Sequence, residues 1–305
     1  MPSVWVNSGL GLAPTGLNQF IPGDGDFMYW LRSSGGTAFF PFRVNMRAGD
    51  VLDYNMGKNF PEFLADQGSI YYNNKLYALT QAGKLYIFDI ASTSWGTQIL
   101  PWAPTSVTAT YSARLQHKLY SCWVSGATLK LLEYDMAIGA GRIITPPAGL
   151  TATNLSNMCS YGGNRLYFIY KDLSLVSLNL STMTITTIAP ATQAPNAPYL
   201  SIYEFYGSVV GAGQFDSGDE KVWGPKFLSG SLWKDTEPQI PRSLFQSPTT
   251  WLTEIFSCGT ILVVVGQSGT NRFVLKLVDP PSSSVKTPNI PFRYPTRWME
   301  IANAT

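Results

Sequence analysis

The sequence predicts an all-β fold, and three observations lead to this prediction. Short runs of β-branched and aromatic residues alternate with turn residues along the whole chain. No window of about eleven residues or more shows a helical hydrophobic period with caps. Two sequence markers also recur about every 45 residues. In an all-β chain, a period of about 40–50 residues is typical of propeller blades, each a four-stranded sheet. We therefore expect a single β-propeller.

Composition supports this fold class. Charged residues make up 13% of the 305 residues, and hydrophobic residues make up 45%. A typical globular chain has about 25% charged residues. The hydrophobic content excludes a disordered chain, and the low charge argues against a coiled coil or a helical bundle. The net charge of +2 is too small for a general nucleic-acid groove, so no nucleic-acid partner is expected.

The first marker is an apolar residue that follows a short strand and a tight turn, as in the segment after the hairpin signal Asn73-Asn74. The equivalent positions are Leu76, Leu119, Leu166, Val209 and Ile261. The second marker is an apolar run that ends at a small acid or amide, in the segments 42–45, 86–89, 132–135, 176–179, 232–235 and 276–279. An Asp or Asn side chain accepts hydrogen bonds from a turn backbone, which explains its recurrence.

Six such units fit the length, with a ring of seven weaker units as the alternative, and together they form one domain that spans residues 1–305. The approximate blades are 25–60, 65–103, 108–150, 155–193, 200–245 and 250–290. Residues 1–24 and 291–305 remain as closure segments, which contain the short β-like pieces Ser3–Val6 and Arg297–Ile301. An open ring would leave two unpaired edges. One of the two pieces is therefore expected to complete the blade at the other end of the chain.

One unit contains Asn73-Asn-Lys-Leu-Tyr-Ala-Leu79 followed by Gly83-Lys-Leu-Tyr-Ile-Phe-Asp-Ile-Ala-Ser-Thr-Ser-Trp95. It resembles a kelch repeat, in which a Lys-Leu-Tyr strand precedes a Tyr-x-Phe-Asp strand, a turn and a Trp. The units around Leu119 and Leu166 resemble it less closely. Kelch blades usually have a Gly-Gly pair after the second strand, which these units lack. The resemblance implies a kelch-like propeller and no particular activity, because propellers have many unrelated functions.

Catalytic and metal-binding motifs are sparse. His117 is the sole histidine, which excludes the multi-histidine copper site of one kelch-like oxidase type. A Ser-His-Asp triad would need this same residue, which lies in a predicted turn. The acidic segments Gly23–Asp26 and Asp216–Glu220 lack the full calcium-loop pattern, so surface turns are favoured for both. We expect no catalytic residue, no metal and no cofactor.

The best local candidate for binding is the insertion Gln214–Pro241, which interrupts the repeat period. Insertions in repeat folds form loops that often lie on the binding face. Exposed Trp rings stack on sugars and anchor protein interfaces. The candidate binding residues are Trp223, Trp233, Trp251, Asp216 and Asp219.

The sequence also contains signals about the compartment. The first sixteen residues lack the basic and apolar regions of a secretory signal peptide. No apolar run approaches the roughly 18 residues that a membrane-spanning helix needs, so no membrane insertion is expected. The three cysteines, Cys122, Cys159 and Cys258, are expected to be buried thiols because their number is odd and small.

Three functions from different classes remain. The composition, low in charge and rich in Ser, Thr, Asn and Gly, resembles that of phage-tail and capsid-associated proteins. The favoured interpretation is therefore a non-enzymatic structural or interaction propeller, located in a virion and bound to other protein subunits. The alternative is a lectin-like propeller that binds a cell-surface carbohydrate or a host receptor. The third is a glycan-cleaving enzyme with carboxylates in the central channel.

Overall fold

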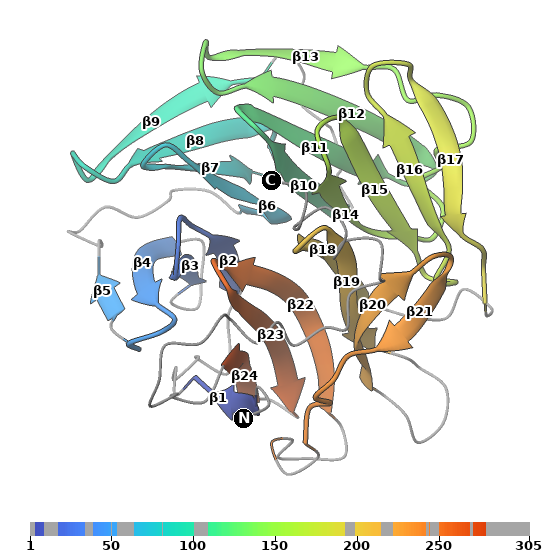
Figure 1. The fold of residues 1–305 in the computed structure, drawn as a ribbon. Helices are drawn as coiled ribbons and strands as arrows, with labels where there is room; N and C mark the ends of the chain where they lie inside the picture. Colours follow the sequence, from blue (N-terminus) through green and yellow to red (C-terminus); the bar gives the residue numbers. More distant parts are fainter. Residues whose placement is uncertain are drawn as a thin grey trace, which may run out of the picture.

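The computed structural model describes residues 4–8, 18–33, 39–49, 51–53, 64–80, 82–100, 109–192, 199–214, 222–241, 244, 250–268 and 271–278. Within these ranges the strands form six sheets of four antiparallel strands, arranged in a ring (Figure 1). The predicted six-bladed β-propeller is therefore confirmed. Among the described residues, no helix has the length and apolarity needed to cross a membrane.

The first three blades follow one another along the chain, and each runs from its innermost to its outermost strand. Blade 1 consists of β2 (Asn18–Pro22), β3 (Phe27–Ser33), β4 (Phe39–Asn45) and β5 (Val51–Asp53). Blade 2 consists of β6 (Leu64–Tyr72), β7 (Lys75–Thr80), β8 (Lys84–Asp89) and β9 (Ser94–Ile99). Blade 3 consists of β10 (Ala109–Leu115), β11 (Lys118–Ser125), β12 (Thr128–Asp135) and β13 (Ala140–Ile144).

The next three blades complete the ring. Blade 4 consists of β14 (Leu155–Tyr161), β15 (Arg165–Tyr170), β16 (Leu175–Asn179) and β17 (Thr184–Ala189). Blade 5 consists of β18 (Tyr199–Phe205), β19 (Ser208–Gln214), β20 (Val222–Ser229) and β21 (Leu232–Asp235). Blade 6 combines β22 (Thr250–Cys258), β23 (Ile261–Ser268) and β24 (Asn271–Val278) with β1 (Val4–Asn7) from the other end of the chain.

The ring closes through the N-terminal of the two predicted closure pieces, Ser3–Val6. Strand β1 pairs antiparallel with β24, with Val6 opposite Lys276. The other candidate, Arg297–Ile301, lies outside the described residues. The first blade begins earlier than the predicted residue 25, because β2 is its innermost strand. The short run Asn18–Pro22 falls within the predicted closure segment 1–24, because no repeat marker precedes it.

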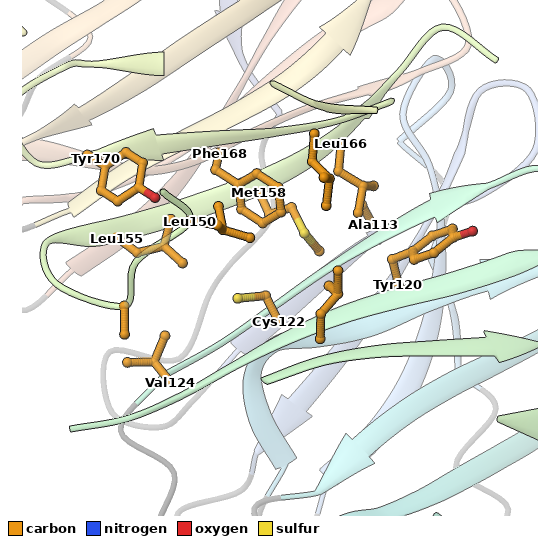
Figure 2. Packing of buried hydrophobic residues seen from close by; sticks show 13 residues of the cluster. Ala113, Tyr120, Cys122, Val124, Leu150, Leu155, Met158, Leu166, Phe168 and Tyr170 are labelled. Carbon is orange, nitrogen blue, oxygen red and sulfur yellow. The ribbon is translucent and has the colours of Figure 1, made fainter. Parts of the chain in front are cut away.

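The hydrophobic core lies between the blades. Six clusters of buried side chains occupy the interfaces between successive blades, including the interface between blade 6 and blade 1. Figure 2 shows the cluster between blades 3 and 4, where Cys122 of β11 points toward Met158 and Phe168 of blade 4. Each blade therefore buries both faces of its sheet against neighbours. The three cysteines are buried and free, as expected.

The tight turns follow the sequence signals, with one exception. Asn73 and Asn74 both have positive φ, which is the geometry of a two-residue hairpin turn. Asn45, Asp89, Asp135 and Asn179 each end the third strand of their blade. In blade 5, however, the matched segment Leu232–Asp235 is the fourth strand, and the third strand ends at Ser229.

The register also corrects one position of the first sequence marker. It places Leu262, rather than Ile261, at the position equivalent to Leu76, one residue after the strand begins.

Candidate functional site

The central channel of the propeller contains a cavity of about 430 Å³. Its wall comes from the first strands of all six blades, β2, β6, β10, β14, β18 and β22, which meet at the centre of the ring (Figure 1). This volume lies within the range of about 300–1,000 Å³ that is typical of ligand cavities. The channel is therefore the candidate site.

Hydroxyl groups of the first strands join neighbouring blades. Ser69 Oγ donates to Gln19 Oε1 at 2.5 Å, which links blades 2 and 1. Ser156 Oγ accepts from Leu200 N at 2.9 Å, and Ser201 Oγ accepts from Ile255 N at 3.2 Å, which links blades 4, 5 and 6. These serines have a structural role, and none of these three hydrogen bonds pairs a serine with a general base.

Two opposite charges lie at the same level of the channel. Arg114 and Glu204 are each the last residue but one of a first strand, β10 and β18, and each precedes a two-residue turn. Both line the cavity. Blade 4, whose equivalent residue is Ser160, lies between them. The hairpin register therefore places a cation and an anion at one end of the channel.

Each of the two charged side chains is held by a backbone group. Arg114 Nη1 donates to the Tyr71 carbonyl oxygen of blade 2 at 2.9 Å. Burial raises the pKa of Glu204 above its usual value, and a hydrogen bond from the Gly207 backbone partly offsets this. Neither residue forms an ion pair with another described residue. Both charges therefore remain available to a ligand.

A third charged residue, Glu254, lines the cavity from β22. It lies four residues before the end of its strand, whereas Glu204 lies one residue before the end of β18. At about 3.3 Å per residue, the two backbone positions are offset by about 10 Å along their strands. The two acids therefore lie at different levels of the channel.

The structure corrects the predicted tryptophan patch. Trp223 of β20 is only 4% exposed, and its ring meets that of Trp233 edge-on at 5.2 Å between centroids. Trp233 is half-buried, and its Nε1 donates to the Leu173 carbonyl oxygen of blade 4 at 3.2 Å. The pair belongs to the core between blades 4 and 5. These rings pack in the core because burying a large aromatic side chain between two blades contributes strongly to stability.

The other three candidate residues lie wholly or partly outside what the structure describes. Trp251 is opposite Gln267 in the β22–β23 ladder, but the placement of its side chain is not described. Asp216 and Asp219 lie outside the described residues.

Arg114 and Glu204 were not among the candidates predicted from the sequence. Aligning the residues just before each Lys-Leu-Tyr-type strand would have placed both at one level of the ring.

The remaining polar candidates have structural partners. Asp24 accepts from the Tyr71 hydroxyl at 2.8 Å, and Asp26 pairs with Arg47 Nε at 2.6 Å. The segment Gly23–Asp26 is thus a stabilised turn. His117 Nε2 lies 3.4 Å from Asp135 Oδ2. Within the described ranges, no group of three or more His, Cys, Asp and Glu side chains is placed to hold a metal ion.

The outer rim carries a second feature. Ile99, at the end of β9, is 80% exposed, and Ile138, in the turn between β12 and β13, is 75% exposed. Gln98 Nε2 donates to the Gly139 carbonyl oxygen at 2.6 Å, so the neighbours of these two isoleucines are in contact. Figure 1 shows the end of β9 near the start of β13 at the edge of the ring. We call Ile99 and Ile138 the rim pair.

No protein-family model and no curated protein matches this chain. Solved structures resemble it at low identity. A structure of YCF48 bound to D1 peptide has 13% identity and a TM-score of 0.54, over 88% of this chain and 80% of that chain. Virginiamycin B lyase from Staphylococcus aureus has 10% identity and a TM-score of 0.54, over 91% and 100% of the two chains. A structure of the mitotic checkpoint complex has 13% identity and a TM-score of 0.53, over 92% and 96%.

These similarities support the fold alone, because the sequence identities are low and the three structures are of unrelated kinds of protein. No family is shown for this chain, and the kelch-like character of its repeat stays a prediction. What the sheets and the comparisons together establish is that the chain is a six-bladed β-propeller.

Proposed function

We propose that this propeller is a non-enzymatic component of a larger protein assembly, which it contacts through its rim. The observation that carries this proposal is the rim pair, in which two isoleucines of adjacent blades are 80% and 75% exposed. Single exposed apolar residues are common, whereas interaction surfaces are marked by contiguous apolar area, to which two neighbouring isoleucines contribute. Fully burying an aliphatic side chain of this size contributes about 1.5–3 kcal/mol. A partner that covers the pair therefore gains a useful part of its binding free energy.

The rim pair is also held in place. Besides the bond to Gly139, Gln98 accepts a hydrogen bond from the Tyr134 hydroxyl of blade 3. Tyr134 is itself buried. The two blades are thus locked together beneath the exposed isoleucines. A rigid apolar contact loses little conformational entropy on binding, which favours association.

Two observations support a binding role over a catalytic one. The channel acids Glu204 and Glu254 lie at different levels of their strands, three residues apart, so their backbone positions are not directly opposite each other. The Trp223–Trp233 pair packs between blades, so the observation that favoured a carbohydrate site no longer supports one. Among the similar structures, YCF48 was solved with D1 peptide and another is a checkpoint complex. In those proteins the same fold occurs together with protein partners.

We further propose that the assembly is a virion, either a phage tail or a capsid-associated layer. This proposal rests on composition, since only 13% of the residues are charged. It predicts that the chain bands with purified virus particles in a density gradient. If the chain stays at the top of the gradient while the particles band below, the virion location is excluded.

The rim contact is tested with the double variant Ile99→Ser/Ile138→Ser. Light scattering over a concentration series measures the native mass of the purified chain and of the complex recovered from its source. The wild type is expected to exceed 33.5 kDa, and the double variant is expected to return to the monomer mass. Leu232→Ser is the control, because Leu232 is 56% exposed on a different blade. A wild-type chain that is a monomer in both preparations would contradict the proposal.

A further inference from the structure

We propose that the end of the central channel that carries Arg114 and Glu204 binds a polypeptide segment with both an acidic and a basic side chain. Arg114 takes the carboxylate of the segment, and Glu204 takes its ammonium or guanidinium group. This site lies on the inner strands β10 and β18, whereas the rim pair lies at the outer edge. The inference goes beyond the proposed function and does not depend on it.

The first argument concerns the use of charge. The chain has only 40 charged residues among 305, yet two of them line one cavity without an ion-pair partner among the described residues. Of the described cavity residues, Arg114 is the only cation. Arg114 is exposed, whereas Glu204 is half-buried, and a carboxylate in a partly desolvated position is unfavourable for the fold unless it is paired. A ligand with the two opposite charges supplies a partner for each of them.

The second argument concerns geometry. Arg114 extends toward blade 2, where its Nη1 contacts the Tyr71 carbonyl oxygen. Glu204 lies close enough to blade 4 for its charge to add to the effect of burial in raising the pKa of Tyr161. The two side chains form no ion pair with each other. Each is held by one hydrogen bond with the backbone, in which Arg114 donates to Tyr71 and Glu204 accepts from Gly207. Such preorganised groups lose little freedom when a ligand binds.

The third argument concerns the kind of ligand. The wall between the two charges consists of Ser160 and the turn residues Gly162 and Gly163, which offer small side chains and accessible backbone groups. Such a surface suits the backbone of an extended segment, which rises about 3.3 Å per residue. Arginine binds carboxylates through paired N–H donors, and it keeps several donors beyond the one used by Tyr71. The site therefore fits a polypeptide segment better than an inorganic ion.

A positional-scanning library of end-capped hexapeptides tests this assignment. The immobilised library is probed with the wild type, Arg114→Gln and Glu204→Gln. The wild type is expected to select peptides that combine Asp or Glu with Lys or Arg. Arg114→Gln is expected to weaken the preference for the acid about tenfold and to keep the preference for the base. Glu204→Gln is expected to do the reverse.

The controls remove one charge elsewhere. Lys130→Gln and Glu237→Gln change exposed residues outside the cavity, and both are expected to keep the wild-type preferences. Arg114→Lys keeps the charge without the paired donors, and it is expected to show an intermediate preference. Thermal melting of each variant establishes that it is folded. The library measures the preference for acidic and for basic residues separately. A general loss of stability would not remove the acid preference in one variant and the base preference in the other.

Three outcomes would overturn the proposal. The library could show no preference for charged residues, or the preferences could survive both channel substitutions. Free aspartate and lysine could also compete as well as the selected peptides, which would assign the site to free amino acids instead of a segment. Selective loss of the acid preference in one variant and of the base preference in the other would support it.

Discussion

Glu204 is expected to make the stability of the fold depend on pH. Burial raises its pKa above the usual 4.5. The folded state therefore holds the proton more tightly than the unfolded chain does, so stability falls as the pH rises from about 4.5 through the raised pKa. A site residue that is unfavourable for stability is common, because function and stability compete at such positions.

We expect Glu204→Gln to raise the melting temperature at neutral pH, because the amide removes the buried charge. The gain should shrink as the pH falls through the raised pKa toward about 4.5, because the folded wild-type carboxyl becomes protonated over this range. Thermal melts at several pH values measure this difference. Glu237→Gln is the exposed control and should show no such trend. An equal or lower melting temperature for Glu204→Gln at every pH would contradict the account of burial.

Individual site residues were the least predictable part of this protein. The tryptophans of the insertion were expected at the surface, but Trp223 is buried against Trp233. Sequence periodicity finds which residues are apolar, and it does not say whether a ring faces a neighbouring blade or solvent. Arg114 and Glu204 look ordinary in the sequence. Their relation appears only when the hairpin registers place them at one level of the channel.

The third-to-fourth-strand turns show how one polar residue organises an element. Asn179 Oδ1 accepts hydrogen bonds from Ser181 N at 2.9 Å and from Thr182 N at 3.2 Å. Asp135 holds its own turn in the same way, through Ala137 N and Ile138 N. These bonds leave few free donors in the turn backbone. The recurrence of Asp and Asn in the sequence therefore has a direct structural cause.

Replacing Asn179 with Ala is expected to lower the free energy of unfolding by about 1–2 kcal/mol, because two turn donors lose their acceptor. Urea denaturation measures this loss, and the slope of the transition should stay the same. Asn179→Asp keeps the accepting oxygen and should retain most of the stability. If Asn179→Ala were as stable as the wild type, the turn bonds would not contribute as described.

Blade 5 shows where the element pattern fails. Its third and fourth strands are joined by a two-residue turn, Gly230-Ser231, and Gly230 has a φ of 63°. Glycine adopts this conformation without a side-chain acceptor, so no Asp or Asn is needed there. The sequence marker consequently matched the next acid, Asp235, in the wrong strand. Repeat markers locate turns only where every turn uses the same chemistry.

At the scale of the whole molecule, the fold was predictable because the repeat is regular. Blade number and ring closure follow from a period of about 45 residues and from the need to avoid unpaired edges. The structure adds that the apolar clusters continue around the ring, with one at each junction between blades. Closure through β1 completes blade 6, whose β24 would otherwise have a free edge.

Removing residues 1–8 tests the importance of this closure. The truncated chain loses the pairing of β1 with β24 and the hydrogen bond from Ser8 N to the Val274 carbonyl oxygen. We expect a lower melting temperature, together with new self-association through the exposed edge of β24. Thermal melting and light scattering measure the two effects.

Val6→Thr is the matched control for this truncation, because it keeps the backbone pairing with Lys276 and a β-branched side chain. It should melt near the wild type and keep the same native mass. A truncated chain that matched the wild type in both measurements would show that the ring is held by the blade interfaces alone. The opposite result would establish that one four-residue strand, far in sequence from its partner, keeps the six blades in a closed ring.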